Sequence, residues 1–345
     1  MTLLNIDKPI RLIELFAGIG SQAKALKRLG ADFEHYRVCE FDKYAIQSYN
    51  AIHGTEFDTS DVTQITANDL GIVDTDKYCY IMTYSFPCQD LSLAGKQQGM
   101  AKGENTRSGL LWEVERLLNE CKELPQILLM ENVTQVHGKK NKEHFDAWIE
   151  FLESKGYANF WKDLNAKNFG IPQNRNRTFM VSVLGGYTYE FPKEFPLELM
   201  LKDVLEIDVE ARFYFTNKQL ERMSAWKSFQ NPLEKVLGGE SISPTITTRI
   251  AVSDGGGINA STKLYSDLLT TDQNLRQNFN DKHIRYYTPK ECWRLMGFND
   301  EDFDLAKEAL DKLDITSQQK EGCLYKQAGN SIVVDVLYYI FKEMF

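Results

Sequence analysis

The chain has 345 residues, of which 43% are hydrophobic and 26% charged, and its formal net charge is −9. This composition is typical of a globular protein with one large domain or a large domain carrying a smaller one, and it excludes a disordered or fibrous chain. The acidic balance argues against a wide basic surface for nucleic acid. Short basic stretches such as residues 139–142 fit either a locally positive cleft or ordinary solvated surface.

The N-terminus lacks the pattern of a signal peptide, and no stretch approaches the ~18 continuous apolar residues of a membrane span. We therefore expect a cytoplasmic protein that is not bound to a membrane. The six cysteines are far apart, and none shows the two-residue spacing of a zinc or thioredoxin-like site. We predict no metal site and expect most cysteines to be reduced core residues.

The first half of the chain alternates short apolar runs with segments of helical periodicity, which predicts an α/β fold with a mostly parallel sheet flanked by helices. The expected strands are residues 11–16, 35–39, 78–84, 126–130 and 178–184. The expected helices are residues 21–29, 109–124 and 143–155. Gly30 is expected to end the first of these helices.

The pattern changes after Gly185-Gly186, where prolines, aromatics and irregular segments replace the alternation. We predict a first domain over residues 1–185 and a smaller one over 186–282. Residues 283–319 connect the parts, and a helix is expected to start at Thr288, which is followed by proline and, three residues on, by glutamate. Residues 320–345 again have helical spacing and are expected to return to the first domain.

A glycine turn follows the first expected strand and opens the first helix, at Phe16-Ala17-Gly18-Ile19-Gly20. Glycines let a backbone approach a ligand closely, and a helix N-terminus presents free amide donors. A plain tight turn would contain the same residues. Glu40 favours a nucleoside site, since it follows the next strand, where a carboxylate can accept hydrogen bonds from ribose hydroxyls. Asp61-Val62 can similarly meet an adenine ring, although a lone aspartate is more often a cap.

A second group of reactive residues follows three other strands. Cys88 comes after strand 78–84, Glu131 ends the next strand, and Arg175 and Arg177 precede the strand after that. Catalytic groups of open parallel sheets collect at such strand ends, so a thiol, a carboxyl group and two guanidinium groups are predicted to converge on one edge. An isolated cysteine is usually structural, but these neighbours favour a catalytic one.

In order, five blocks match the signature blocks of the cytosine-5 DNA methyltransferases, which this sequence resembles from residue 11 to the C-terminal helix. The blocks are Phe16-x-Gly18-x-Gly20, Pro87-Cys88-Gln89, Glu131-Asn132-Val133, Gln173-x-Arg175-x-Arg177 and Gln327-Ala328-Gly329-Asn330-Ser331. Residues 243–249 resemble the ninth block of the family. The resemblance implies a Rossmann-like S-adenosylmethionine-dependent domain of the bacterial or phage restriction-modification type, with a target-recognition domain at 186–282.

The resemblance also implies the role of each site residue. Cys88 would add to carbon 6 of a cytosine and make carbon 5 nucleophilic, and Glu131 would protonate ring nitrogen 3. Arg175 and Arg177 would hold the cytosine carbonyl and a phosphate. Because these atoms are inaccessible inside a duplex, the base would be flipped out, and residues 90–106 would close over it.

The implied cofactor is S-adenosylmethionine, and the implied partner is double-stranded DNA. A cognate restriction endonuclease acting separately is a further possible partner, and a monomer is expected. The residues carried over to the cofactor site are Phe16, Ala17, Gly18, Gly20, Glu40, Phe41, Asp61, Val62, Pro87, Leu110, Asn330 and Ser331.

The residues of the sequence support three alternative functions less well. A dinucleotide-dependent oxidoreductase explains the glycine turn and Glu40 but not Cys88 or Glu131. A transfer RNA cytosine methyltransferase shares nearly every block but usually lacks a long recognition domain, whereas about 100 residues separate Leu184 from His283. A non-catalytic regulator is disfavoured by the complete set of reactive residues. The DNA sequence that is recognised does not follow from the chain.

Overall fold

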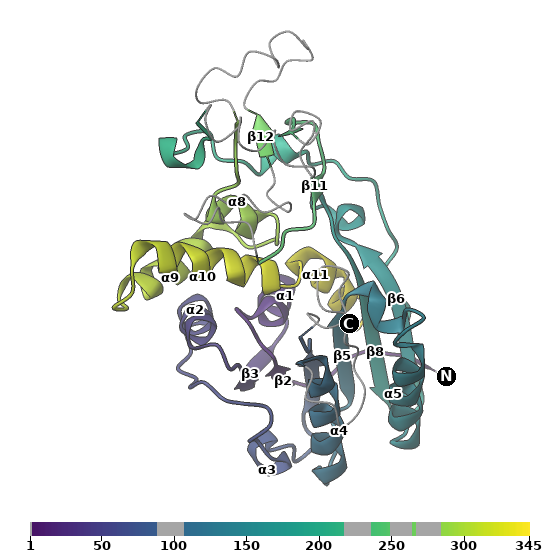
Figure 1. Ribbon diagram of the computed structural model, residues 1–345. Helices are drawn as coiled ribbons and strands as arrows, with labels where there is room; N and C mark the ends of the chain where they lie inside the picture. Colours follow the sequence, from purple (N-terminus) through teal and green to yellow (C-terminus); the bar gives the residue numbers. More distant parts are fainter. Residues whose placement is uncertain (1, 88–106, 217–235, 249–263, 267–283) are drawn as a thin grey trace. The chain divides into compact units, whose positions relative to one another are not determined.

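The computed structural model describes residues 2–87, 107–216, 236–248, 264–266 and 284–345 (Figure 1). The chain forms two compact units. The first comprises Met1–Asn165, Asn176–Glu194 and Val334–Phe345, and the second comprises Ala166–Arg175 and Phe195–Val333. The first unit therefore contains the predicted first domain except for residues 166–175, and its last segment begins at Val334 rather than at residue 320.

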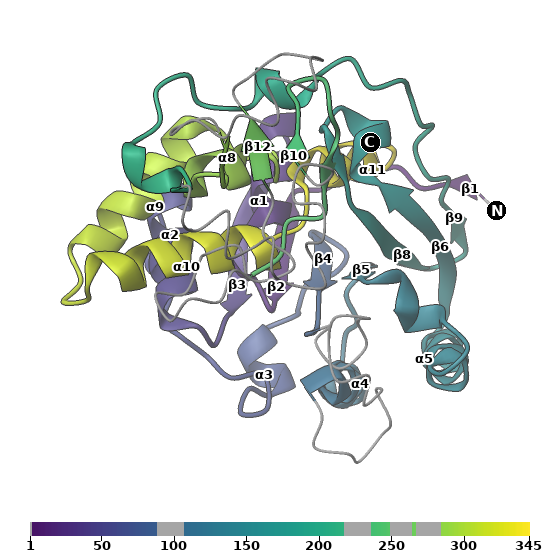
Figure 2. The ribbon, with the colours of Figure 1, turned by 45° about the horizontal axis from the view of Figure 1, so that its top comes forward.

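The first unit is built on a six-stranded sheet with the order β3-β2-β4-β5-β8-β6, which can be followed from side to side in Figure 2. Its strands are β2 (Ile10–Leu15), β3 (Phe33–Cys39), β4 (Cys79–Tyr84), β5 (Ile127–Asn132), β6 (Tyr157–Asn165) and β8 (Asn176–Leu184). The first four strands of the order are parallel, and β8 runs antiparallel to both of its neighbours. The predicted mostly parallel sheet is confirmed, whereas β6 and the reversal of β8 were not predicted. A separate pair joins β1 (Thr2–Leu3) to β9 (Tyr187–Thr188).

Helices cover both faces of this sheet. They are α1 (Ser21–Leu29), α2 (Lys43–His53), α3 (Ala67–Leu70), α4 (Leu111–Glu120), α5 (Lys142–Ser154) and α11 (Val334–Lys342), with short 3-10 turns η1 (Arg107–Leu110) and η2 (Thr134–His137). On one face, α4 and α5 bury residues such as Leu117 and Trp148 against Met82 of β4. On the other, α1 and α11 pack side by side (Figure 1).

The predicted helix at residues 21–29 is confirmed, and Gly30 ends it in the left-handed conformation with φ 75°. The predicted helix over 109–124 is shorter than expected. Its first turn is the 3-10 turn η1, and Cys121 caps the end of α4 in an extended conformation. The expected helix at 143–155 is α5, displaced by one residue.

The second unit has short strands and irregular connections, as the sequence predicts. Its elements are η3 (Ala166–Phe169), β7 (Gln173–Asn174), η4 (Leu201–Asp203), η5 (Ala211–Phe213), β10 (Val236–Leu237), β11 (Ser243–Pro244), β12 (Leu264–Ser266), β13 (Ile284–Arg285), α8 (Pro289–Arg294), α9 (Asp300–Asp311) and α10 (Ser317–Asn330). The predicted capping box is present: Glu291 N donates to Thr288 Oγ1 over 3.2 Å, and Thr288 N donates to Glu291 Oε2 over 2.8 Å. Within the ranges given above, no helix is long and apolar enough to cross a membrane.

Candidate active site

The glycine turn after β2 has a backbone that few side chains tolerate. Phe16, Gly18 and Gly20 have φ of 59°, 58° and 79°. A Cβ atom on Gly20 would lie 2.2 Å from His53 Nε2, so glycine is required there. A Cβ on Gly18 would meet nothing within 4 Å, which leaves space beside the backbone. The turn thus packs against His53 at Gly20 and leaves open space beside its backbone at Gly18.

Glu40, at the end of β3, is bonded to this turn. Its Oε2 accepts a hydrogen bond from Gly18 N over 2.7 Å, and its Oε1 accepts one from Asp42 N over 2.7 Å. A carboxylate has about four acceptor sites, so these two bonds do not preclude a ribose hydroxyl. The next residue, Phe41, is 78% exposed, which is unusual for a phenyl ring. The structure therefore brings the glycine turn, the carboxylate and an exposed aromatic ring together.

The loop that follows α2 reaches the same place. Ser60 N donates to the carbonyl oxygen of Glu40 over 3.0 Å, so Asp61 follows directly on a residue bonded to Glu40. The Oδ1 atom of Asp61 accepts bonds from the backbone and hydroxyl of Thr63, both 2.9 Å, which is the capping role considered from the sequence. Val62 is buried in the core cluster against which Leu110 packs. The predicted adenine residues are thus adjacent to the predicted ribose residue.

On the neighbouring strands β5 and β8, Glu131 and Arg177 form an ion pair. Arg177 Nε lies 3.3 Å from Glu131 Oε1, and their side chains are only 16% and 10% exposed. The pair arises because β5 ends where the antiparallel β8 begins, with Asn132 opposite Thr178. A largely buried carboxylate beside a guanidinium is a site that can bind and protonate a polar ring.

Cys88 and residues 90–106 lie outside the described residues, but the two residues before the cysteine are described. Asn132 Nδ2 donates to the carbonyl oxygen of Phe86 over 3.0 Å, and Asn132 Oδ1 accepts from Val133 N over 2.9 Å. The amide that follows Glu131 therefore holds the segment that leads, through Pro87, into the predicted nucleophile.

Arg175, two residues before Arg177, belongs to the second unit and is only 4% exposed. Its Nη1 donates to Ile246 O over 2.8 Å, and its Nη2 donates to Ser331 O over 2.8 Å and to Gly329 O over 3.2 Å. The guanidinium thus bonds to the backbone of two other sequence blocks, residues 243–249 and 327–331. Its predicted catalytic role stays a prediction.

Asn330 ends α10, and Ser331 caps that helix. Ser331 Oγ donates to Gln327 O over 2.7 Å. A Cβ on Gly329 would lie 2.4 Å from Thr248 N, so this block packs closely against the segment that resembles the ninth block. Both Asn330 and Ser331 lie in the second unit, and their predicted place at the cofactor stays a prediction.

The profile of the C-5 cytosine-specific DNA methylases matches residues 10–345. The chain belongs to this family. It is 31% identical to the type II methyltransferase M2.ScrFI of Lactococcus lactis subsp. cremoris, over 97% of this chain and 99% of that protein. It is 33% identical to the type II methyltransferase M.HhaI of Haemophilus parahaemolyticus, over 96% and 93%.

The structure of the Dnmt2 methyltransferase from S. pombe has the same fold as this methylase, with a TM-score of 0.74 at 21% identity over 98% of each chain. Membership of the family confirms the predicted fold class and activity, a DNA (cytosine-5)-methyltransferase. Members of the family use S-adenosylmethionine and act on DNA.

Sequence reasoning missed a buried polar group beneath the glycine turn of the methylase. Glu14 of β2 is fully buried, and its carboxylate accepts bonds from Tyr49 Oη over 2.5 Å and from Ala23 N over 3.3 Å. Burial raises the pKa of Glu14 to about 7. Burial also lowers the pKa of the neighbouring His35 to about 4 and that of His53 to about 3. A glutamate inside an otherwise apolar strand was the signal that could have revealed this group.

Proposed function

We propose that this methylase transfers a methyl group to carbon 5 of a cytosine flipped out of duplex DNA, with Cys88 as nucleophile. The observation that carries the proposal is the bond from Asn132 to Phe86, which ties the segment entering Cys88 to the strand end that carries Glu131. With β4 and β5 paired from Ile81 to Tyr84, the thiol and the carboxyl group come from adjacent strand ends.

The chemistry requires a thiolate. Its sulfur forms a bond to carbon 6 of the cytosine, the double bond between carbons 5 and 6 breaks, and carbon 5 becomes nucleophilic. After methylation, carbon 5 loses its proton to solvent, and the electron pair re-forms the double bond between carbons 5 and 6 as the bond between sulfur and carbon 6 breaks. Ring nitrogen 3 returns its proton to Glu131, so the thiolate and the aromatic ring are both restored. Burial raises the pKa of Cys39 and Cys121 to about 11, so these thiols are protonated at neutral pH. They are therefore unsuited to this step.

Glu131 and Arg177 act on the same ring. Addition at carbon 6 moves electron density to ring nitrogen 3, where the Glu131 carboxyl group supplies a proton. Arg177, 3.3 Å from that carboxylate, orients it and can bind the cytosine carbonyl through its remaining N–H groups. Its positive charge also favours the thiolate form of a nearby cysteine.

The residues of the glycine turn fit S-adenosylmethionine. The space beside Gly18 admits a ligand next to the backbone, and the exposed ring of Phe41 gains by covering an adenine. Glu40 would hold the ribose, and Asp61 and Val62 would contact the adenine. When bound, the cofactor supplies an electrophilic methyl group. Pro87, Leu110, Asn330 and Ser331 complete the proposed cofactor set.

Duplex DNA is the proposed substrate because both relatives described above are named type II methyltransferases. Residues 186–282 would read the bases, and the protein would act as a monomer, with any cognate restriction endonuclease acting separately. Extrusion of the cytosine follows from its inaccessible position inside a duplex.

The test is covalent trapping. Wild-type protein, duplex DNA containing 5-fluorocytosine at the target position and S-adenosylmethionine should give a denaturation-resistant adduct, because fluorine at carbon 5 prevents the final elimination. Cys88→Ala should give none while still binding the cofactor. An adduct formed by Cys88→Ala, or methyl transfer by that variant, would overturn the assignment, and a single-stranded or transfer RNA substrate preferred over duplex DNA would overturn the substrate.

A further inference from the structure

Two side chains of helix α4, Arg116 and Glu120, bond to the loop that carries Asp61 and Val62 and to the residue that follows this loop. This loop, residues 61–66, forms a turn in which Gln64 N and Ile65 N both donate to Asp61 O, over 2.9 and 3.2 Å. These internal bonds set the shape of the turn. Its position relative to the rest of the unit depends on further contacts, including the bond from Ser60 N to Glu40 O and the burial of Val62.

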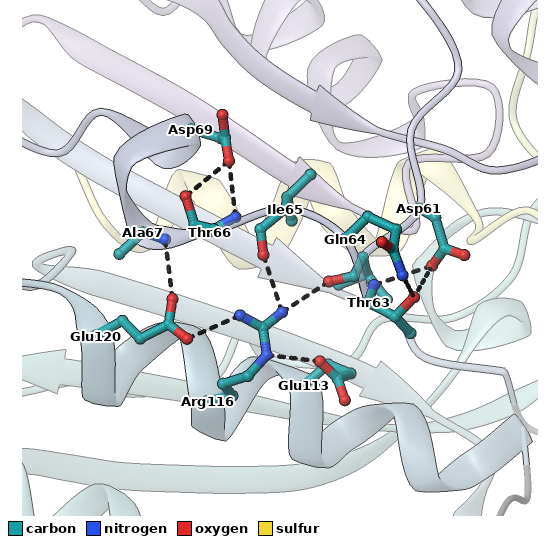
Figure 3. A network of polar contacts seen from close by, with 11 residues as sticks. Asp61, Thr63, Gln64, Ile65, Thr66, Ala67, Asp69, Glu113, Arg116 and Glu120 are labelled. Carbon is teal, nitrogen blue, oxygen red and sulfur yellow. Dashed lines mark hydrogen bonds and ion pairs between the residues drawn. The ribbon is translucent and has the colours of Figure 1, made fainter.

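Arg116 attaches this turn to α4 (Figure 3). Its Nη2 donates to the carbonyl oxygens of Val62 and Ile65, over 3.0 and 2.9 Å. The remaining donors bond to acidic residues one turn away on the same helix: Nε to Glu113 Oε2 over 2.8 Å and Nη1 to Glu120 Oε1 over 2.9 Å. The guanidinium is therefore fixed on both sides by carboxylates while it holds two carbonyls of the loop.

Glu120 makes a second attachment between the same two elements. Its Oε2 accepts from Ala67 N over 3.2 Å, at the first residue of α3, while its Oε1 is bonded to Arg116. Asp69 caps the same end of α3 by accepting from the backbone and hydroxyl of Thr66, both 2.8 Å. The loop is thus bounded by a clamp, which we define as Arg116 with Glu113 and Glu120.

The clamp also fixes a second residue of the proposed cofactor site. Leu110 ends η1 and immediately precedes α4, and it packs against the core cluster that contains Val62. Because Arg116 lies on the helix that begins after Leu110 and bonds to Val62 O, it sets the spacing between the two residues.

We propose that Arg116 is a positioning residue for the cofactor, holding Val62 and Asp61 where they contact the adenine ring. The proposal rests on the proposed function, since it assumes that S-adenosylmethionine binds at Asp61 and Val62. A lysine cannot replace the arginine, because its single ammonium group lacks the planar fork that bonds the two carbonyls and two carboxylates together.

The test compares two arginines that both bond to backbone carbonyls of this region. Arg116→Lys should raise the Kd for S-adenosylhomocysteine, measured by calorimetry, and the KM for S-adenosylmethionine by about tenfold, the scale of one lost charge-assisted hydrogen bond. The kcat at saturating cofactor should stay within about twofold. The control is Arg37→Lys, since Arg37 Nε donates to Asp69 O over 2.8 Å, beyond the adenine residues. It should leave both constants unchanged.

A double-mutant cycle with Asp61→Asn tests whether Arg116 changes the affinity for the cofactor through Asp61. Asparagine keeps an oxygen for Thr63 but removes the carboxylate, so Arg116→Lys should raise Kd less in this background than in the wild type. Additive effects would show that Arg116 does not act through Asp61. Glu120→Gln, which keeps the side-chain shape, should show the same direction as Arg116→Lys with a smaller increase.

Two sets of results separate the failures. If wild-type protein binds S-adenosylhomocysteine and Arg116→Lys binds it equally well, or if the variant loses only thermal stability or only kcat, the positioning role is wrong and the proposed function stands. If wild-type protein binds neither S-adenosylmethionine nor S-adenosylhomocysteine, the proposed function is wrong, and the proposed role of Arg116, which depends on it, is wrong too.

Discussion

Two regions of the first unit, one beside β2 and β3 and the other beside β4, β5 and β8, hold their functional side chains in different ways. At the cofactor edge, defined by Gly18, Glu40, Phe41, Asp61 and Val62, the carboxylates accept bonds from backbone amides. At the catalytic edge, defined by Phe86, Glu131, Asn132 and Arg177, a carboxylate and a guanidinium face each other.

Backbone donors remain when one side chain is replaced. Removing one member of a largely buried ion pair instead leaves the other charge unpaired where it is poorly solvated. We therefore expect single substitutions at the cofactor edge to change the affinity for the cofactor modestly. At the catalytic edge they should change turnover strongly.

Glu131→Gln should have the largest effect among the described residues. Glutamine keeps the shape but cannot supply a proton, so kcat should fall by roughly 10² to 10⁴-fold, the usual contribution of general acid catalysis. Cofactor binding should be unchanged, since the residues of the cofactor edge follow β2, β3 and α2, whereas Glu131 lies on β5. Single-turnover methyl transfer and calorimetry measure the two quantities. Unchanged turnover would remove Glu131 from the mechanism.

Replacing Arg175 and Arg177 separately by methionine tests whether an arginine that bonds to backbone carbonyls and one that pairs with Glu131 have different roles. Arg177→Met should lower kcat by roughly 10²-fold, the cost of one electrostatic donor in an active site. Arg175→Met removes buried donors from Ile246 O and Ser331 O, so it should destabilise the fold by roughly 1–3 kcal/mol. Urea unfolding and kcat separate the two outcomes. Equal behaviour of the variants would mean that the contacts do not distinguish their roles.

Phe41→Ala should have a moderate effect confined to the cofactor edge. Loss of the ring should raise the cofactor Kd by about tenfold, on the scale of an aromatic stacking contact, while kcat at saturation and the melting temperature stay constant. Stability is unaffected because Phe41 is 78% exposed. Ile207→Ala is the control, since Ile207 is 98% exposed and lies in the second unit. An equal change in both variants would argue against adenine stacking.

Glu14→Gln should give the smallest change, visible in the pH dependence of stability. Burial raises the pKa of Glu14 from 4.5 to about 7. The folded state then binds this proton more tightly than the unfolded chain, so the contribution is fully present below pH 4.5 and is lost as pH rises through about 7. The stability of the wild type relative to Glu14→Gln should therefore fall by about 1 kcal/mol between pH 6 and pH 8.

Urea unfolding of the two proteins at pH 6, 7 and 8 measures this difference. His35 and His53, whose pKa values are lowered by burial, have the opposite sign: their contribution is present above pH 6.5 and is lost in acid. Both histidines remain in the variant, so their effect cancels in the difference. Parallel pH profiles for the two proteins would refute the raised pKa.

Much of the fold could be predicted because its signals are local. The apolar run of β4 predicted a strand, all of whose residues are buried, and Gly30 predicted the end of α1. The capping box at Thr288 predicted the start of α8. The reversal of β8 could not be predicted, because the direction of a strand depends on its partner in the sheet rather than on its own residues.

The sequence by itself determined the order of the elements, the family and the set of reactive residues, since periodicity, caps and blocks depend on near neighbours along the chain. Only the tertiary structure decided what each side chain bonds to. Arg175 and Arg177 look equivalent in the sequence, yet one binds backbone carbonyls and the other faces Glu131. The physical reason is that a guanidinium bonds to whichever acceptor the fold brings within about 3 Å, and that acceptor is commonly far away in the chain.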